Sequence, residues 1–393
     1  MNDTRVIEAI HYETNKPVRI KIDDGLISEM NEITDSVQFQ NLYVAPGLID
    51  NQVNGYKGID FSDTGLTTEK MRMAVEAINI DGVTSFLATV ITGSHENLLK
   101  NFRNLANSLN DDNIRYSVAG FHLEGPYISP EDGYYGCHPA EFIRKPSWHE
   151  FEQYQEAAGG NIKIVTLSPE IDGSIYFIDK CIQNSIIVAI GHTNATAEQI
   201  NRAVDHGARI STHLGNGCAN LIDRHRNPLW PQLANDHLMT SIIADGHHLL
   251  PEEIQVFYKV KGPHKIILTS DVTHLIGMPP GRYNFLGSEV VLTPEGLIEN
   301  PVLNCLAGAS RPLRTGVGNV MKFTGCNPGE AVNMASGNVA RIYNLSDRGS
   351  LTPGKRADLI LFELNVNTPV IKQVIVKGRI VLPQTSYPTP HIL

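Results

Sequence analysis

The stretch SVAGFHLEGPY, residues 117–127, decides how the rest of the chain is interpreted. It runs through small and apolar residues and then stops on His122 and Glu124, just before a Gly-Pro break. A carboxylate at the end of a buried strand is costly unless an opposite charge stabilises it. The stretch therefore raises the question of what stabilises Glu124.

Seven further apolar runs of strand length lie along the chain, and amphipathic segments with helix-capping signals separate most of them. The runs span residues 43–55, 82–92, 161–170, 186–194, 208–216, 239–248 and 265–273. The helical segments span residues 67–82, 94–109, 147–160, 194–207 and 251–262. Runs that are apolar throughout indicate a parallel sheet covered on both faces, and eight such strands close a barrel. The sequence thus predicts an α/β fold of the (β/α)8 TIM type.

The two ends of the chain have a different pattern. Residues 1–45 and 350–393 contain short alternating strands joined by turns, which predicts one small β domain built from both termini. The barrel would then occupy residues 46–349. Within it, residues 282–304 carry hairpin signals and are predicted to form an excursion after the eighth strand.

Composition narrows the class of partner. The 393 residues carry a net charge of −10 without basic runs, which argues against a nucleic-acid surface and favours a small-molecule partner. The start MNDTRVIEAI has no basic-then-apolar leader, and no apolar run approaches about 18 residues. We therefore expect no membrane partner and a cytoplasmic location.

In a parallel barrel the carboxyl ends of the strands meet at one face, where active sites lie. Polar residues at these ends are Gln52, Asn54, His122, Glu124, His192, His213, Asp245, His247, His248 and Asp271. Glu124, His192 and His213 together form a three-ligand set for a catalytic divalent metal, with a fourth position left for water. Asp271, on the closing strand, is the candidate general base. For His122, packing inside the barrel is at least as good an interpretation.

Several short motifs occur in an order that resembles a known family. They are PGLIDNQVNG, HLEGPY, GHTNA, THLGNG, IADGHH, TSDVT, CLAGAS and GSLTPGKRADLILF. This series is similar to that of the N-acetylglucosamine-6-phosphate deacetylases, a branch of the amidohydrolase superfamily, and covers about residues 44–365. The resemblance implies a (β/α)8 barrel with a β-sandwich built from both termini, and the same metal ligands.

The resemblance also implies roles that spacing alone does not give. His138 matches the histidine that polarises the amide carbonyl, and its neighbour Cys137 is placed at the substrate site. The remaining substrate-binding residues implied are Asn216, Gly217, His248, Leu306, Ala307 and Gly308. An arginine lent by the second subunit of a homodimer would meet the phosphate. It is Arg226 if HRNP is aligned with the family pattern, and Arg224 if residues are counted without a gap.

Gln52 and Asn54 stand where much of the superfamily has a His-x-His pair for a second metal. Because neutral amides are weak ligands for zinc-like ions, we expect one divalent ion per subunit. Zinc is the first choice, and iron, cobalt or manganese would also suit the ligands. The implied reaction removes the acetyl group from N-acetylglucosamine 6-phosphate and yields glucosamine 6-phosphate and acetate.

Two alternatives stay open. One is another deacylase or cyclic amidase of the same superfamily, acting on an N-acyl amino acid or a related amide. The other is a non-enzymatic barrel relative, which is disfavoured because Glu124, His192, His213 and Asp271 are all present. A substrate panel with and without the 6-phosphate separates the enzyme alternatives.

Overall fold

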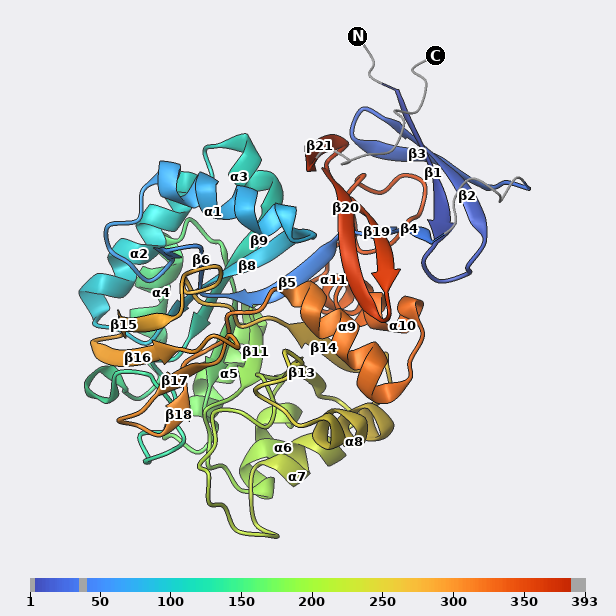
Figure 1. Cartoon of the computed structure of the whole chain (residues 1–393). Coiled ribbons are helices and arrows are strands. Elements are labelled where there is room, and N and C mark those ends of the chain that lie inside the picture. The colour runs from blue at the N-terminus through green and yellow to red at the C-terminus, as the bar shows by residue number, and fades with distance from the viewer. Residues whose placement is uncertain (1–3, 35–40, 383–393) are drawn as a thin grey trace.

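The computed structural model describes residues 4–34 and 41–382, and its centre is a barrel of parallel strands (Figure 1). Eight strands hydrogen-bond in the order β14-β13-β12-β11-β10-β9-β8-β5. A parallel bridge between Val53 and Val272, with the Asp271 amide donating to the Gln52 carbonyl at 3.1 Å, joins the first strand to the eighth. The strands are β5 (Leu48–Val53), β8 (Val83–Ile91), β9 (Val118–Glu124), β10 (Ile162–Leu167), β11 (Ile187–Ile190), β12 (Ile210–Ser211), β13 (Met239–Ile243) and β14 (Ile266–Thr269). The predicted eight-stranded barrel is confirmed.

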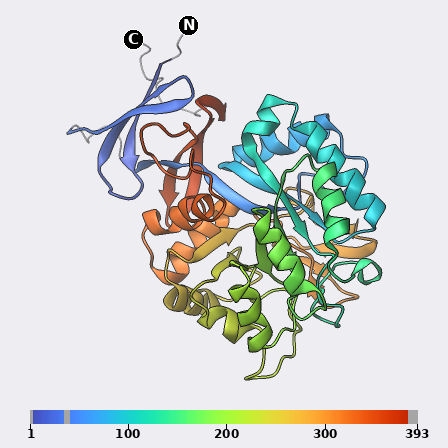
Figure 2. The same ribbon diagram turned by 180° about the vertical axis from the view of Figure 1, so that it is seen from behind.

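Helices surround the barrel, as Figures 1 and 2 show from opposite sides. The α-helices are α1 (Thr68–Ile80), α2 (His95–Ser108), α3 (Asp112–Ser117), α4 (Trp148–Ala157), α5 (Ser174–Gln183), α6 (Ala197–Asp205), α7 (Leu229–Ala234), α8 (Pro251–Lys261), α9 (Leu313–Thr324), α10 (Pro328–Met334) and α11 (Gly337–Ile342), and Ala140–Phe142 form a 3-10 turn. Thr196 caps the N-terminus of α6 in a capping box with Gln199. All five predicted helical segments are present.

The chain ends form a second sheet beside the barrel. Its seven strands are ordered β21-β20-β19-β4-β1-β2-β3, and only the β1–β4 pair is parallel. They are β1 (Arg5–His11), β2 (Pro17–Asp23), β3 (Leu26–Glu32), β4 (Leu42–Pro46), β19 (Leu359–Asn365), β20 (Thr368–Val376) and β21 (Arg379–Leu382). Residues 1–3, 35–40 and 383–393 of the predicted small domain lie outside the described residues. The division of the chain at residues 45 and 350 stays a prediction.

An excursion after the eighth barrel strand forms a small antiparallel sheet, which lies on the other side of the barrel from the terminal sheet in Figure 1. Its strands are β15 (Gly281–Phe285), β16 (Ser288–Leu292), β17 (Ile298–Asn300) and β18 (Cys305–Leu306), and a separate short pair comprises β6 (Gly55–Tyr56) and β7 (Ile59–Asp60). The predicted hairpin is thus present. Among the described residues no helix has the length and apolarity to cross a membrane.

Candidate active site

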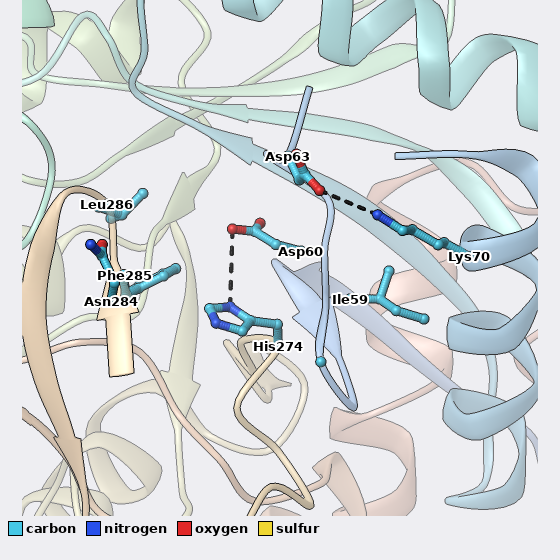
Figure 3. A pocket seen from close by; sticks show the side chains of 9 residues that line it. Ile59, Asp60, Asp63, Lys70, His274, Asn284, Phe285 and Leu286 are labelled. Atoms are coloured by element: carbon cyan, nitrogen blue, oxygen red, sulfur yellow. Dashed lines mark ion pairs between the residues drawn. The ribbon is translucent and has the colours of Figure 1, made fainter. Parts of the chain in front are cut away.

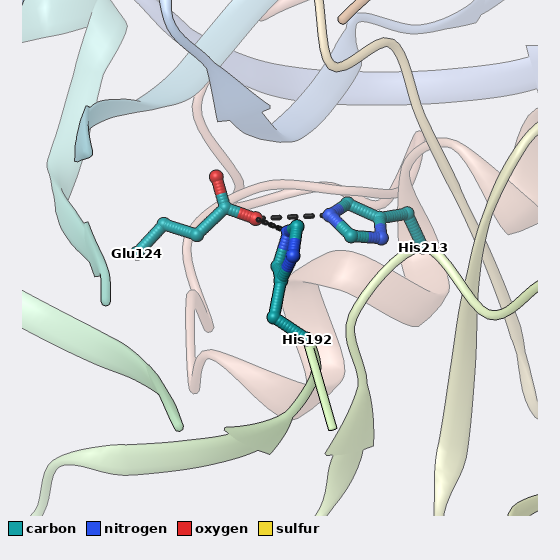
Figure 4. Close-up of side chains that lie close together, drawn as sticks. All are labelled: Glu124, His192 and His213. Carbon is teal, nitrogen blue, oxygen red and sulfur yellow. Dashed lines mark hydrogen bonds and ion pairs between the residues drawn. The ribbon is translucent and has the colours of Figure 1, made fainter. Parts of the chain in front are cut away.

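Three side chains from separate strand ends converge at the carboxyl end of the barrel (Figure 4). Glu124 ends β9, while His192 and His213 each lie two residues beyond the end of β11 and β12. The Glu124 Oε1 atom is 2.9 Å from Nε2 of His213 and 3.6 Å from Nε2 of His192. One ligand atom from each residue lies within 4.8 Å of the others, and all three residues are buried. The structure therefore brings the predicted metal ligands together.

Electrostatics keep this carboxylate charged despite its burial. Burial alone would raise the pKa of Glu124, but the neighbouring imidazoles of His192 and His213 hold it well below its usual range. The same contact with Glu124 raises the pKa of His213 against the opposing effect of burial. A buried anion with two imidazole nitrogens beside it is the donor set of a catalytic divalent-metal site.

The ring orientation of His192 fits a metal ligand. Its Nδ1 atom lies 2.9 Å from the Tyr134 carbonyl oxygen, so Nδ1 carries the proton and donates it there. The lone pair on Nε2 then faces Glu124. Metal-binding histidines typically donate their second ring N–H to such a carbonyl.

The backbone is unusual at these positions. His192 has a φ of +51°, and His213 has a φ of +27°. Left-handed backbone is costly for a non-glycine residue and clusters at functional sites, where surrounding structure enforces it. Gly217, with a φ of +63°, packs so closely that an added Cβ would lie 2.9 Å from Nδ1 of His192. A side chain there would displace the ring.

The predicted base lies beside this cluster and is held by the two amides of the first strand. Gln52 Nε2 donates to Glu124 Oε1 and to Asp271 Oδ1, both at 2.9 Å, and Asn54 Nδ2 donates to Asp271 Oδ1 at 2.7 Å. Burial, followed by the charge of Glu124, raises the pKa of Asp271 to about 6. A carboxylate with this pKa accepts and returns protons near neutral pH.

Asp50 supports the turn that carries Asp271, and the sequence reasoning missed this role. It is buried, and its Oδ1 accepts hydrogen bonds from the amides of Gln52 and Ser270 and from the Thr269 hydroxyl, at 3.3, 3.1 and 3.0 Å. These bonds fix the turn that gives Asp271 its φ of +52°. The signal was an acidic residue inside the otherwise uncharged first predicted strand.

His138 faces the cluster from the loop after β9. Its Nδ1 atom is 2.7 Å from the Thr92 hydroxyl, and its Nε2 atom is 4.0 Å from Glu124 Oε2. Burial, followed by the neighbouring His192 ring at 4.5 Å, lowers the pKa of His138 to about 3, so the ring is neutral. If Thr92 donates to Nδ1, Nε2 carries the proton that a substrate oxygen could accept. Sequence reasoning missed Thr92, although it is the last residue of the second predicted strand, 82–92.

The other predicted substrate residues are spread around this centre. Gly308, with a φ of +67°, lies against Asp271, because an added Cβ would be 3.1 Å from the Asp271 carbonyl oxygen. The Leu306 carbonyl accepts from Cys137 Sγ at 3.4 Å, and Ala307 pairs with β17 through its amide. Asn216 Nδ2 bonds the His213 carbonyl at 3.3 Å, and His248 Nδ1 lies 2.8 Å from Asp245 Oδ2.

The two candidate arginines differ from the other predicted substrate residues in their exposure to solvent. Arg224 and Arg226 are both exposed on the long segment between His213 and α7. Their backbones are anchored, since Asp223 Oδ1 accepts from the Arg226 amide at 2.7 Å and the Arg224 carbonyl accepts from Trp230 Nε1 at 3.1 Å.

His122 is packed inside the barrel and does not join the ligand cluster. Its Nε2 atom lies 2.8 Å from the Thr166 hydroxyl, and burial lowers its pKa to about 4. This agrees with the packing interpretation.

A separate cavity of about 360 Å³ lies beside the β6–β7 pair (Figure 3). There Asp60 Oδ2 is 4.0 Å from His274 Nδ1, and burial raises the pKa of Asp60 to about 6. The cavity contains none of the predicted site residues.

Comparisons with known proteins identify the family of this chain. A sequence model of the amidohydrolase family matches residues 43–381. An N-acetylglucosamine-6-phosphate deacetylase of Bacillus subtilis is 34% identical over 87% of this chain and 88% of its own length. An N-acetylgalactosamine-6-phosphate deacetylase of Escherichia coli O157:H7 is 29% identical over 92% of this chain and 94% of its own length.

A solved structure shows the same architecture. The crystal structure of N-acetylglucosamine-6-phosphate deacetylase from Thermotoga maritima superposes with a TM-score of 0.86 at 27% identity, covering 97% of this chain and 100% of the other. The chain therefore belongs to the amidohydrolase family, within the branch of the N-acetylglucosamine-6-phosphate deacetylases.

Proposed function

We propose that this chain hydrolyses N-acetylglucosamine 6-phosphate to glucosamine 6-phosphate and acetate. The observation that carries the proposal is the buried Glu124–His192–His213 cluster with Asp271 held beside it. Such a cluster and a nearby base are what hydrolysis of an amide requires. The relatives named for this reaction support the choice of substrate.

Glu124, His192 and His213 would hold one divalent cation, and we propose zinc as the first choice. When bound, such an ion lowers the pKa of a water from about 15.7 toward 7 and polarises an amide carbonyl. Gln52 and Asn54 donate to carboxylates through their NH2 groups, so they do not offer a second ion a ligand set. This supports one ion per subunit.

Asp271 takes the proton of the attacking water and later gives it to the departing amine. Its position is fixed by Gln52 and Asn54, and its raised pKa suits both transfers. His138 donates from Nε2 to the acetamide oxygen as negative charge develops there. One donor of this kind typically contributes about 3 kcal/mol to transition-state stabilisation.

The phosphate end is proposed to be completed by a second copy of the chain. Arg226, or Arg224, is exposed and would reach the phosphate of the neighbouring subunit in a homodimer, while His248 would act from within the same chain. Asn216, Gly217 and the segment Leu306–Gly308 would line the sugar. We further propose that the enzyme works in the cytoplasm, where phosphorylated sugars are retained.

The C4 epimer is a second candidate substrate. An N-acetylgalactosamine-6-phosphate deacetylase matches 92% of this chain at 29% identity, close to the values for the N-acetylglucosamine enzymes. The metal centre acts on the acetamide and does not distinguish the two sugars. The distinction would come from contacts to the 4-hydroxyl.

The deciding experiment is a substrate panel on zinc-loaded protein. Acetate release is measured with N-acetylglucosamine 6-phosphate, N-acetylgalactosamine 6-phosphate, unphosphorylated N-acetylglucosamine and an N-acetyl amino acid. We expect the highest kcat/KM with the first compound and a loss of at least 100-fold without phosphate. Equal or better hydrolysis of the N-acetyl amino acid would refute the proposal, and a preference for the galacto epimer would reassign the sugar. Arg226→Ala and Arg224→Ala, mixed with a His213→Ala partner, would identify the arginine that acts across the interface.

A further inference from the structure

Two cysteines from distant segments meet at the edge of the active site. Cys137 Sγ and Cys305 Sγ are 2.9 Å apart, and 168 residues separate them in sequence. Both are free and half-buried. The distance between the sulfurs therefore exceeds the length of a disulfide bond by only about 1 Å.

Each cysteine is adjacent to residues of the candidate site. Cys137 directly precedes His138, whose ring packs on His192 at 4.5 Å. Cys305 begins β18, which continues into the Leu306–Gly308 segment, and the Ala309 amide then donates to the Asp271 carbonyl at 3.0 Å. A bond between the two sulfurs would join the loop that carries the carbonyl-polarising histidine to the segment that supports the base.

The pair is chemically asymmetric, which suits thiol exchange. The contact with Cys137 lowers the pKa of the Cys305 thiol, whereas the same contact and burial raise the pKa of Cys137. Cys305 is thus the thiolate that attacks first. The other cysteines differ: Cys181 and Cys326 are buried, and Cys218 Sγ lies 3.7 Å from the Gly215 carbonyl oxygen.

We propose that Cys137 and Cys305 form a reversible disulfide that lowers deacetylase turnover. The Cys305 thiolate attacks one sulfur of a low-molecular-weight disulfide and releases one small thiolate. Cys137 then loses its proton to solvent and attacks Cys305 Sγ, which releases the second small thiolate. Two protein thiols are oxidised and one small disulfide is reduced to two thiols; a reducing dithiol reverses the exchange.

The expected consequence follows from the geometry. Bond formation draws the sulfurs together by roughly 1 Å and shifts His138, the Leu306–Gly308 segment, or both. Because a misplacement of about 1 Å can cost about 100-fold in rate, we expect kcat/KM to fall about 10- to 100-fold. This consequence rests on the proposed function, whereas the crosslink itself does not.

The test uses the full chain loaded with zinc, because zinc has no redox chemistry of its own and the oxidant cannot act on the metal. The protein is incubated with glutathione disulfide, and intact mass, non-reducing peptide mapping and turnover are measured together. We expect the mass to fall by two hydrogen atoms, a peptide joining residues 137 and 305, and recovery of turnover with dithiothreitol. The mass and the peptide are measured even if no substrate is turned over, so failure of the proposed function and failure of the crosslink are distinguishable.

Variants separate the crosslink from other oxidation. Cys305→Ser and Cys305→Ala should give no crosslink and keep their turnover in oxidant. Cys218→Ser, a matched half-buried cysteine, should crosslink and lose turnover like the unsubstituted chain. Absence of the 137–305 peptide, a crosslink without loss of turnover, or equal inhibition of the Cys305 variants would each overturn the proposal.

Discussion

The rim of the barrel has two regions, and the side chains around the buried carboxylate are of a different chemical type in each. Around β9, β11 and β12 the strand ends offer a carboxylate and two imidazoles to a cation. Around β5 and β14 they offer two neutral amides to a second carboxylate, Asp271. Gln52 touches both carboxylates and so connects the regions. One half of the rim thus carries the proposed ion ligands, while the other half holds the proposed base, Asp271, by hydrogen bonds from two amides.

The largest expected effect comes from breaking the ion-binding half. His213→Ala removes one of three ligands, so bound zinc should be lost, and turnover should fall by at least about 1,000-fold because water regains its high pKa. Elemental analysis and acetate release measure both quantities. Chelation of the unsubstituted protein should reproduce the loss, and added zinc should restore turnover. A His213→Ala protein with full metal content would contradict the assigned ligands.

The second-largest expected effect tests the half of the rim that holds Asp271 and leaves the three metal ligands unchanged. Asp271→Asn keeps the shape of the side chain but cannot accept the proton, so turnover should fall about 100- to 10,000-fold at unchanged zinc content. His122→Gln is the matched control inside the barrel and should keep its zinc. Normal turnover in Asp271→Asn would remove this residue from the mechanism.

A smaller effect concerns pH. Burial and the charge of Glu124 raise the pKa of Asp271 to about 6, and a bound cation opposes that rise. The base is the charged form, so kcat/KM should fall as the pH drops below an apparent pKa of 6 or less. The Asn54 hydrogen bond lowers this pKa; Asn54→Ala should therefore move the acid limb to higher pH by about one unit.

The control for this shift is Asn101→Ala, a buried asparagine in α2 that donates to the Ser62 carbonyl. Its pH profile should match that of the unsubstituted chain. An acid limb that moves to lower pH in Asn54→Ala would mean that the amide does not stabilise the charged base.

The smallest expected effect concerns His138. Thr92→Val keeps the side-chain volume but removes the hydroxyl that lies 2.7 Å from His138 Nδ1. Loss of one hydrogen bond of about 1 kcal/mol corresponds to about a fivefold fall in kcat, with KM and zinc content little changed. Loss of zinc in this variant would show that Thr92 supports the metal ligands and not the carbonyl donor.

The strand ends could be predicted because an apolar run is visible in the local sequence. Their convergence could be predicted because the carboxyl ends of the strands meet at one face in every parallel barrel. Glu124, His192 and His213 follow from this geometry, and the resemblance added His138. Long-range contacts were not predictable in the same way. The Gln52 bridge between two carboxylates and the pairing of Cys137 with Cys305 depend on side-chain positions that no short pattern specifies. Asp50 was missed because an acid inside a strand has no periodicity that indicates its partners.

Two helices for which the sequence analysis made no prediction begin without a side-chain cap. Gly173 precedes α5 in left-handed conformation, and Pro312 precedes α9. The arginines were ambiguous because the segment between His213 and α7 has no repeat pattern, and because their proposed phosphate contact is made to a second copy of the chain.

The seven-stranded terminal sheet has a consequence for synthesis. β4 hydrogen-bonds to β1 on one edge and to β19 on the other, yet β19 lies near the opposite end of the chain. During translation the N-terminal strands therefore keep an open edge until the ribosome has made the barrel, and such edges favour pairing with other chains. Premature termination before Leu359 would leave this edge exposed, so incomplete chains should aggregate even when their barrel has formed.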